Sequence, residues 1–347
     1  MSNSSISKAL IAGLFALSTA ASMAAEPGYH IIARYPIGGH DTGYDYLRLD
    51  PASHRLFVAH ATRVEVLDAD SGKKLGEIPD TPGVHGIAFA PEFHHGFTTN
   101  GTARSVTMFD LGTLKTLSVS KETGVKPDSI AYDPESHHVF VVNGGSTGDV
   151  SVIAPDTGAI VATVPLGGGK LEEIQLDGHG RAFVNDEAHN VVHVFDTHKL
   201  TKLTSWPVSP GEEPTGLAFD PQTHRLFAAC GNDKLVALDS ETGKVLGTAS
   251  IGSDPDGAAF DPRTKRVLVP TRDGKLSVVN VAAKDKYPTL QTLKTEPGAR
   301  TIALDSRNGR VYIPYAKFGP APAPSAQDPK PRPVMDAESF TVLVAGE

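Results

Sequence analysis

The sequence predicts an all-β fold, a seven-bladed β-propeller whose last blade is closed by the N-terminal strand. The 347 residues include 34 glycines and 26 prolines, which indicates many short elements joined by turns. A pattern of four short apolar strands recurs at spacings of 40 to 44 residues, a period typical of four-stranded propeller blades. The last copy stops one strand short, and an extra strand precedes the first copy. The two ends are therefore expected to complete one blade.

The first 25 residues have the features of a secretory signal peptide. Lys8 precedes an apolar run over 9–17, and small residues follow over 18–25, as in cleaved export signals. The apolar run is shorter than the roughly 20 residues that cross a bilayer. We expect residues 1–25 to be removed, leaving one periplasmic or secreted propeller domain over 26–347. We expect that domain to be a monomer without a membrane span.

Seven copies of the repeat follow. The residue that ends the first strand of each copy marks its position: Asp50, Ala90, Asp133, Asp177, Asp220, Asp261 and Asp305. Proline follows four of these aspartates and starts a turn, and Ser-Gly or Thr-Gly pairs occur where the third strand turns into the fourth. Glycine at that place permits the positive φ of a tight hairpin.

The two ends of the chain differ from the other copies. The stretch 319–333 holds six prolines in fifteen residues, too many for a hydrogen-bonded strand. We expect it to be a loop on the side of the channel mouth, because it joins a second strand to a third. Phe340–Ala345 resumes the strand pattern, and Tyr29–Tyr35 has strand composition. Pairing of these two segments would close the ring and remove a free sheet edge.

Several short motifs resemble a known repeat. The segments 140–143 (FVVN) and 182–185 (AFVN), with the Thr-Gly turns at 157–158 and 242–243, resemble the YVTN repeat. The tail, FGP at 318–320 and SF at 339–340, is similar to that of YncE-like bacterial proteins. The resemblance implies a periplasmic propeller, and it also raises single-stranded DNA binding. The net charge of −8 and the single tryptophan argue against nucleic acid as a partner.

The first strand of each blade lines the channel of a propeller, and the loops entering these strands form what we call the channel mouth. Five residues before the markers lie Asp45, His85, Asp128, Glu172, Thr215, Asp256 and Arg300. Four carboxylates against one arginine predict a mouth that attracts cations. Ca²⁺ or Mg²⁺ suits the carboxylates, with Asp128 and Glu172 as first candidates, and His85 could admit a transition metal. The alternative is that these residues are solvated and pair with Arg300, Lys126 and Lys170.

A second ring lies at the ends of the second strands. His60, Asn143 and Asn185 come from this ring and are further candidates for ligand binding. The single cysteine, Cys230, excludes an intramolecular disulfide and is expected to be a buried thiol.

These features predict a binding or scaffold protein rather than an enzyme. Its channel mouth would bind a small polar ligand, a cation or a partner protein. The alternative is a metal-assisted hydrolase or lyase that resembles propeller lactonases, with Asn143, Asn185, Asp128 and Glu172 around the ion. The sequence has no G-x-S-x-G motif and no Walker loop, which favours binding.

Overall fold

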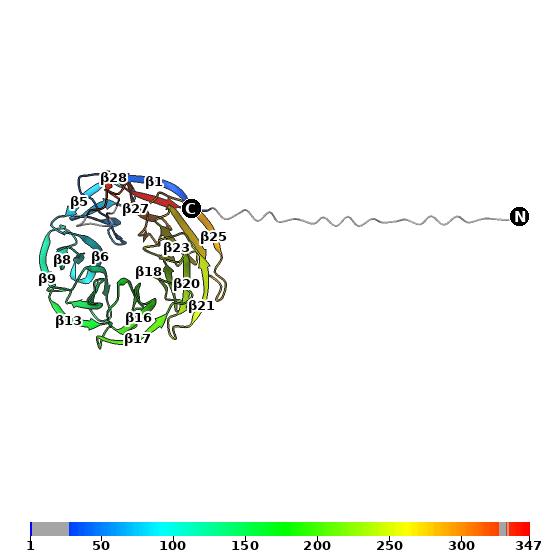
Figure 1. The fold of residues 1–347 in the computed structure, drawn as a ribbon, viewed down its shortest axis with the longest axis horizontal. Coiled ribbons are helices and arrows are strands. Elements are labelled where there is room, and N and C mark those ends of the chain that lie inside the picture. Colours follow the sequence, from blue (N-terminus) through cyan, green and yellow to red (C-terminus); the bar gives the residue numbers. More distant parts are fainter. Residues whose placement is uncertain (2–27, 326–330, 332) are drawn as a thin grey trace.

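The computed structural model describes residue 1 and residues 28–325, 331 and 333–347. It consists of seven four-stranded antiparallel sheets arranged as blades around a central axis (Figure 1). The predicted all-β, seven-bladed propeller is confirmed. In the described part of the chain no helix is long and apolar enough to span a membrane. The predicted signal peptide, 1–25, falls almost wholly among residues 2–27, outside the described residues.

Each blade is numbered by its place in the sequence. The strands are β1 (His30–Pro36), β2 (Leu47–Asp50), β3 (Arg55–His60), β4 (Arg63–Asp68), β5 (Lys74–Ile78), β6 (Val84–Ala90), β7 (His95–Asn100), β8 (Ser105–Asp110), β9 (Thr116–Lys121), β10 (Pro127–Asp133), β11 (His138–Asn143), β12 (Asp149–Ile153), β13 (Ile160–Pro165), β14 (Leu171–Leu176), β15 (Arg181–Asp186), β16 (Val191–Asp196), β17 (Thr201–Pro207), β18 (Pro214–Asp220), β19 (Arg225–Cys230), β20 (Lys234–Asp239), β21 (Val245–Ser250), β22 (Ala259–Asp261), β23 (Arg266–Thr271), β24 (Lys275–Asn280), β25 (Thr289–Lys294), β26 (Ala303–Leu304), β27 (Val311–Phe318) and β28 (Met335–Gly346). One 3-10 helix, η1 (Pro91–Phe93), lies between β6 and β7.

Blades 1 to 6 are each built from four consecutive strands, β2–β5 through β22–β25. Blade 7 has the order β1-β28-β27-β26, so the first strand of the chain is its outer strand. Figure 1 shows β1 beside β28 at the point where the ring closes. The register pairs His30 with Gly346 and Tyr35 with Val342. The predicted closure by Tyr29–Tyr35 against Phe340–Ala345 is therefore confirmed.

The core lies between neighbouring blades. The third residue of the second strand is a fully buried phenylalanine in five blades: Phe57, Phe97, Phe140, Phe183 and Phe227. Four of these rings, all but Phe97, pack against aromatic rings of neighbouring strands, as Phe57 does against Phe89 with 4.8 Å between the ring centres. Large rings at one repeated position fill the wedge between two blades and hold each blade to the next.

In six of the seven blades the turn after the inner strand is formed by the marker aspartate, and blade 2 has Ala90 and η1 there instead. The aspartate carboxylate accepts a hydrogen bond from the backbone N–H two residues later, at 3.0 Å for Asp50 and 3.0 Å for Asp220. The histidine that ends this turn, such as His54 or His224, has a positive φ of 56° or 53°. The repeated aspartates and histidines are thus turn residues.

The long hairpin of blade 7 differs from the prediction in one respect. The ladder between β27 and β28 continues beyond Phe340 to the pairs Lys317–Asp336 and Phe318–Met335. β28 therefore begins five residues earlier than expected. The described residues between 319 and 333 form no strand, in agreement with the predicted proline-rich loop.

Candidate functional site at the channel mouth

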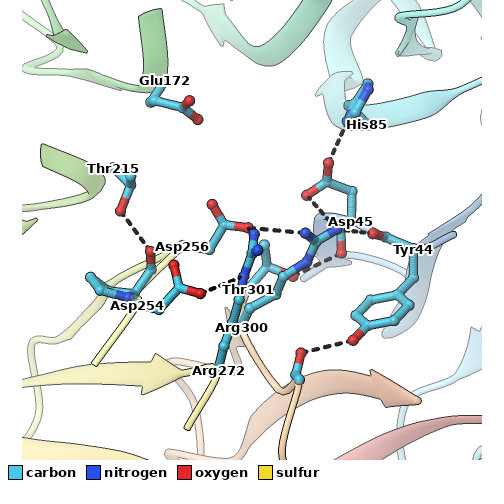
Figure 2. Close-up of polar contacts among 12 residues, drawn as sticks. Tyr44, Asp45, His85, Glu172, Thr215, Asp254, Asp256, Arg272, Arg300 and Thr301 are labelled. Carbon is cyan, nitrogen blue, oxygen red and sulfur yellow. Dashed lines mark hydrogen bonds and ion pairs between the residues drawn. The ribbon is translucent and has the colours of Figure 1, made fainter. Parts of the chain in front are cut away.

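Six residues predicted to form the site lie where the chain enters the inner strands. His85, Asp128 and Glu172 are each the second residue of an inner strand, in β6, β10 and β14. Asp45, Asp256 and Arg300 lie two or three residues before β2, β22 and β26. They come from six different blades, because each occupies the same place in its repeat. Figure 2 shows Asp45 and Asp256 beside Arg300, His85 next to Asp45, and Glu172 farther away.

The tightest group consists of Asp45, His85 and Asp128. One ligand atom from each of the three lies within 4.8 Å of the others. His85 Nδ1 is hydrogen-bonded to a carboxylate oxygen of Asp45 and lies 3.7 Å from Asp128 Oδ1. The Asp128 side chain is only 5% exposed. Two carboxylates and an imidazole from three blades thus converge on one point.

The pKa values of this group reflect its crowding. Burial opposes the charge on His85, but the hydrogen bond to Asp45 and the charge of Asp128 outweigh burial and raise the His85 pKa. Burial also opposes the charge on Asp45, but the nearby Arg300 and His85 outweigh burial and lower the Asp45 pKa. Asp128 has the opposite outcome, because burial and the neighbouring charge of Asp45 raise its pKa. Two close carboxylates compete for the same positive charge, as expected for like charges in one site.

Arg300 links the group to the other side of the mouth. Its guanidinium lies 3.8 Å from an Asp45 oxygen and 3.4 Å from an Asp256 oxygen, and it donates to the backbone carbonyl of Tyr44. Arg272 lies 2.8 Å from the same Asp256 oxygen. The dashed lines in Figure 2 connect these residues in one network. Asp45 and Asp256 are thus positioned by arginines from blades 6 and 7.

Glu172 stands apart from that network in Figure 2. Burial raises its pKa well above the ordinary value, and the charges of Asp128 and Asp256 add to the effect. Lys170 lies 3.2 Å from Glu172, and Lys126 lies 3.0 Å from Asp128.

The prediction of a mouth with four carboxylates and one cation needs correction. Lys126, Lys170 and Arg272 also contact these carboxylates. The pairing with Arg300, Lys126 and Lys170 that the sequence left open as an alternative is present in the structure. The tentative metal pair Asp128 and Glu172 is also not the pair that the structure groups, since Asp128 lies with Asp45 and His85. Counting along the repeats located the ring of residues but could not show which neighbours face each other.

His60, Asn143 and Asn185 lie inside the blades. His60 is fully buried, 3.3 Å from Glu65, with its ring against Phe340. Asn143 donates to the Thr123 carbonyl and to Ser151, and Asn185 donates to the carbonyls of Thr215 and Gly216 in the next blade. These hydrogen bonds connect strands and blades. They do not bring the three side chains to the group at the mouth.

Cys230 is buried, as predicted. Burial raises the pKa of its thiol to about 12, so the thiolate, which is the nucleophile, is rare at neutral pH.

Sequence reasoning missed a set of polar residues deeper in the channel. Tyr46, Arg48, Glu173 and Gln175 line a cavity of about 230 Å³ next to the mouth. They stand four and two residues before the markers of blades 1 and 4. Alternate residues of a strand share a face, so counting back from each marker in steps of two would have found them.

The fold is shared with proteins of known structure. The chain is similar to hydrazine synthase of Kuenenia stuttgartiensis, with a TM-score of 0.68 and 15% identity over 80% of this chain and 94% of that chain. No family model and no curated protein matches the chain. At 15% identity the likeness supports the β-propeller fold alone.

Proposed function

We propose that this protein is an exported binding propeller whose channel mouth holds a divalent cation between Asp45, His85 and Asp128. The observation that carries the proposal is the convergence of their ligand atoms within 4.8 Å from three blades. Mixed oxygen and imidazole donors suit Mn²⁺ or Zn²⁺ better than Ca²⁺ or Mg²⁺, which prefer oxygen ligands alone. The bound ion would in turn offer open positions to a small polar ligand or to a partner protein.

Binding would require three rearrangements at the mouth. The proton in the hydrogen bond between His85 and Asp45 has to leave, because a metal ligand must be deprotonated. The ammonium of Lys126 has to turn away from Asp128, and the guanidinium of Arg300 has to lose its contact with Asp45. Both are long side chains that can reach solvent or other acceptors, and Arg300 keeps Asp256 as a partner. The affinity should therefore rise with pH as His85 loses its proton.

The repeat residues support a finer placement of the chain. The FVVN and AFVN segments and the Thr-Gly turns resemble YVTN-repeat propellers, and the features of residues 1–25 resemble an export signal. We propose on this basis that the chain is a YncE-like periplasmic protein.

A thermal-shift panel tests the proposed cation site. Purified chain without its first 25 residues would be titrated with MnCl₂, ZnCl₂, CaCl₂ and MgCl₂ at pH 7.5. A ligand at 100 times its Kd stabilises a protein by about 2.7 kcal/mol, so a saturable rise in Tm with Mn²⁺ or Zn²⁺ is expected. The variant Asp45→Asn/Asp128→Asn should lose the rise.

The matched control is Asp254→Asn. Asp254 lies near the same mouth and pairs with Arg272 at 3.7 Å, but its side chain is 66% exposed and it is outside the group. This variant should respond to the cation as the wild type does. An equal response in the double variant would show that the cation binds elsewhere, and the proposal would be wrong.

A further inference from the structure

A second cavity opens at the end of the channel opposite the mouth. We call this cavity of about 500 Å³ the vestibule. It is lined by the last residues of the inner strands and by the turns that follow them. Arg48, Glu173 and Gln175 line both the vestibule and the smaller cavity near the mouth. These three residues therefore stand where the two cavities meet.

Small residues around the channel axis leave room there. The position two residues before the marker is an alanine in five of the seven blades: Ala88, Ala131, Ala218, Ala259 and Ala303. Blades 1 and 4 are the exceptions, with Arg48 and Gln175 at this level. The inner strands converge on the axis, so two long side chains at one level are accommodated because the other five are short.

Arg48 is a cation without a partner. Its side chain is exposed to the channel, and among the described residues the structure gives its guanidinium no hydrogen bond or ion pair. Burial lowers the pKa of Arg48, and the charge of Glu173 opposes this effect. A guanidinium carries five N–H donors and stays charged, so the donors of Arg48 can bind an acceptor that enters the channel.

The neighbouring polar groups are already engaged. Glu173 accepts a hydrogen bond from the backbone N–H of Leu217 at 2.8 Å, and Gln175 donates to the Leu217 carbonyl at 2.7 Å. The amide of Gln175 lies 3.3 Å from Glu173. Glu173 is thus held by blade 5 and by its own strand, and it leaves the donors of Arg48 available.

Most of the other residues that line the vestibule are apolar, and Asp50 is the charged residue among them. The half-buried side chains of Phe89, Phe219, Phe260 and Leu304 line it together with the small residues of the inner strands. Each of the three phenylalanine rings packs on one side against a ring of the core, Phe57, Phe183 or Phe227. A concave site lined mainly by apolar side chains, with a few polar and charged groups, is typical of a small-molecule site.

We propose that the vestibule binds a small amphiphilic carboxylate, with its head group on Arg48 and its apolar body against the phenylalanine side chains. A carboxylate matches the planar fork of a guanidinium and forms two parallel hydrogen bonds with it. The apolar body would cover the half-buried rings. This site lies at the opposite end of the channel from the proposed cation site and takes a ligand of opposite charge.

Four ligands of related structure test the proposal on the wild-type chain. Octanoate carries both the charge and the apolar body, octylammonium reverses the charge, octanol removes it, and acetate removes the apolar body. Isothermal titration calorimetry at pH 7 should show saturable 1:1 binding of octanoate, and affinities at least tenfold weaker for the other three. Equal binding of octanoate and octylammonium would overturn the proposal, because only the anion can pair with Arg48.

Variants then locate the head group. Arg48→Gln should weaken octanoate about 10- to 100-fold, the usual range for loss of a charge-assisted pair, and Arg48→Lys should retain part of the affinity. Arg104→Gln is the matched control, because Arg104 is an exposed arginine in the turn between β7 and β8 and is not among the residues that line either cavity. Unchanged octanoate affinity in a folded Arg48→Gln variant would refute the assignment. Asp45→Asn/Asp128→Asn should bind octanoate normally, which separates this site from the cation site.

Discussion

Replacing Tyr35 with alanine should weaken the closure of the ring. Tyr35 lies in β1, the outer strand of blade 7, and is 6% exposed. Its hydroxyl donates to the carbonyls of Ala69 and Asp70, at 3.1 and 2.8 Å, in the turn between β4 and β5 of blade 1. Its ring fills the space over Gly72, where an added Cβ would lie 2.2 Å from the ring. The side chain therefore ties the N-terminal strand to the neighbouring blade.

The expected loss of stability follows from the burial of the Tyr35 ring, and two smaller changes in the same strand serve for comparison. Truncation of a buried aromatic side chain costs about 3–5 kcal/mol, so Tyr35→Ala should lower the free energy of unfolding by roughly 4 kcal/mol. Tyr35→Phe removes only the hydroxyl and should cost about 1 kcal/mol. Ile32→Ala is the control, since Ile32 is 40% exposed on the same strand and a surface change costs about 0.5 kcal/mol.

Urea unfolding of the three variants, followed by tryptophan fluorescence and by circular dichroism, measures this order. Coincidence of the two signals would justify a two-state treatment. The reasoning is refuted if Tyr35→Ala is no less stable than Ile32→Ala, because β1 would then contribute nothing to the joint between blades 7 and 1.

Three further predictions concern charged groups. Burial raises the pKa of Glu173 to about 8, against opposing contributions from a backbone N–H and a nearby arginine. The folded state therefore holds this proton more tightly than the unfolded chain, and the free energy of unfolding should fall as pH rises from about 4.5 to about 8. Urea unfolding of Glu173→Gln over that pH range should lack this contribution. The pKa of His85 is raised by Asp45 and Asp128, so its contribution to stability is complete below the unfolded pKa of 6.5 and is lost as pH rises through the folded pKa; NMR titration should show a lower His85 pKa in Asp45→Asn, and an unchanged value would contradict the pairing. Arg225 is 3% exposed and donates to two backbone carbonyls of blade 6 at 2.6 Å each. Arg225→Met should therefore lower the free energy of unfolding in urea by about 3 kcal/mol. A loss below about 1 kcal/mol would show that these hydrogen bonds do not hold blades 5 and 6 together.

The repeat made the fold predictable because its signals are local. The marker aspartates, the Thr-Gly turns and the strand lengths all depend on residues a few positions apart. The closure of blade 7 could also be predicted, since one strand was missing at one end and one was in excess at the other. The early start of β28 could not be predicted, because the pairs from Lys317 to Met335 lie at the edge of a proline-rich segment whose composition suggested a loop.

The site was only partly predictable, for reasons of geometry. Equal spacing placed Asp45, His85 and Asp128 at one level of the channel, as the structure shows. It could not show that Asp45 and His85 are hydrogen-bonded to each other or that the lysines just before β10 and β14 turn towards the carboxylates. Those contacts depend on side-chain conformations. His60 and Asn143 share the mouth side of their blades, but their side chains turn into the blades and bond to neighbouring strands.

The most direct test of the proposed function is a calorimetric titration of the wild-type chain with Mn²⁺ at pH 6.0 and pH 7.5, beside Asp45→Asn/Asp128→Asn. The account predicts one Mn²⁺ per chain, tighter binding at pH 7.5 because His85 must lose its proton, and no binding in the double variant. Absence of saturable binding to the wild type, or the same isotherm in the double variant, would contradict a cation site at the channel mouth.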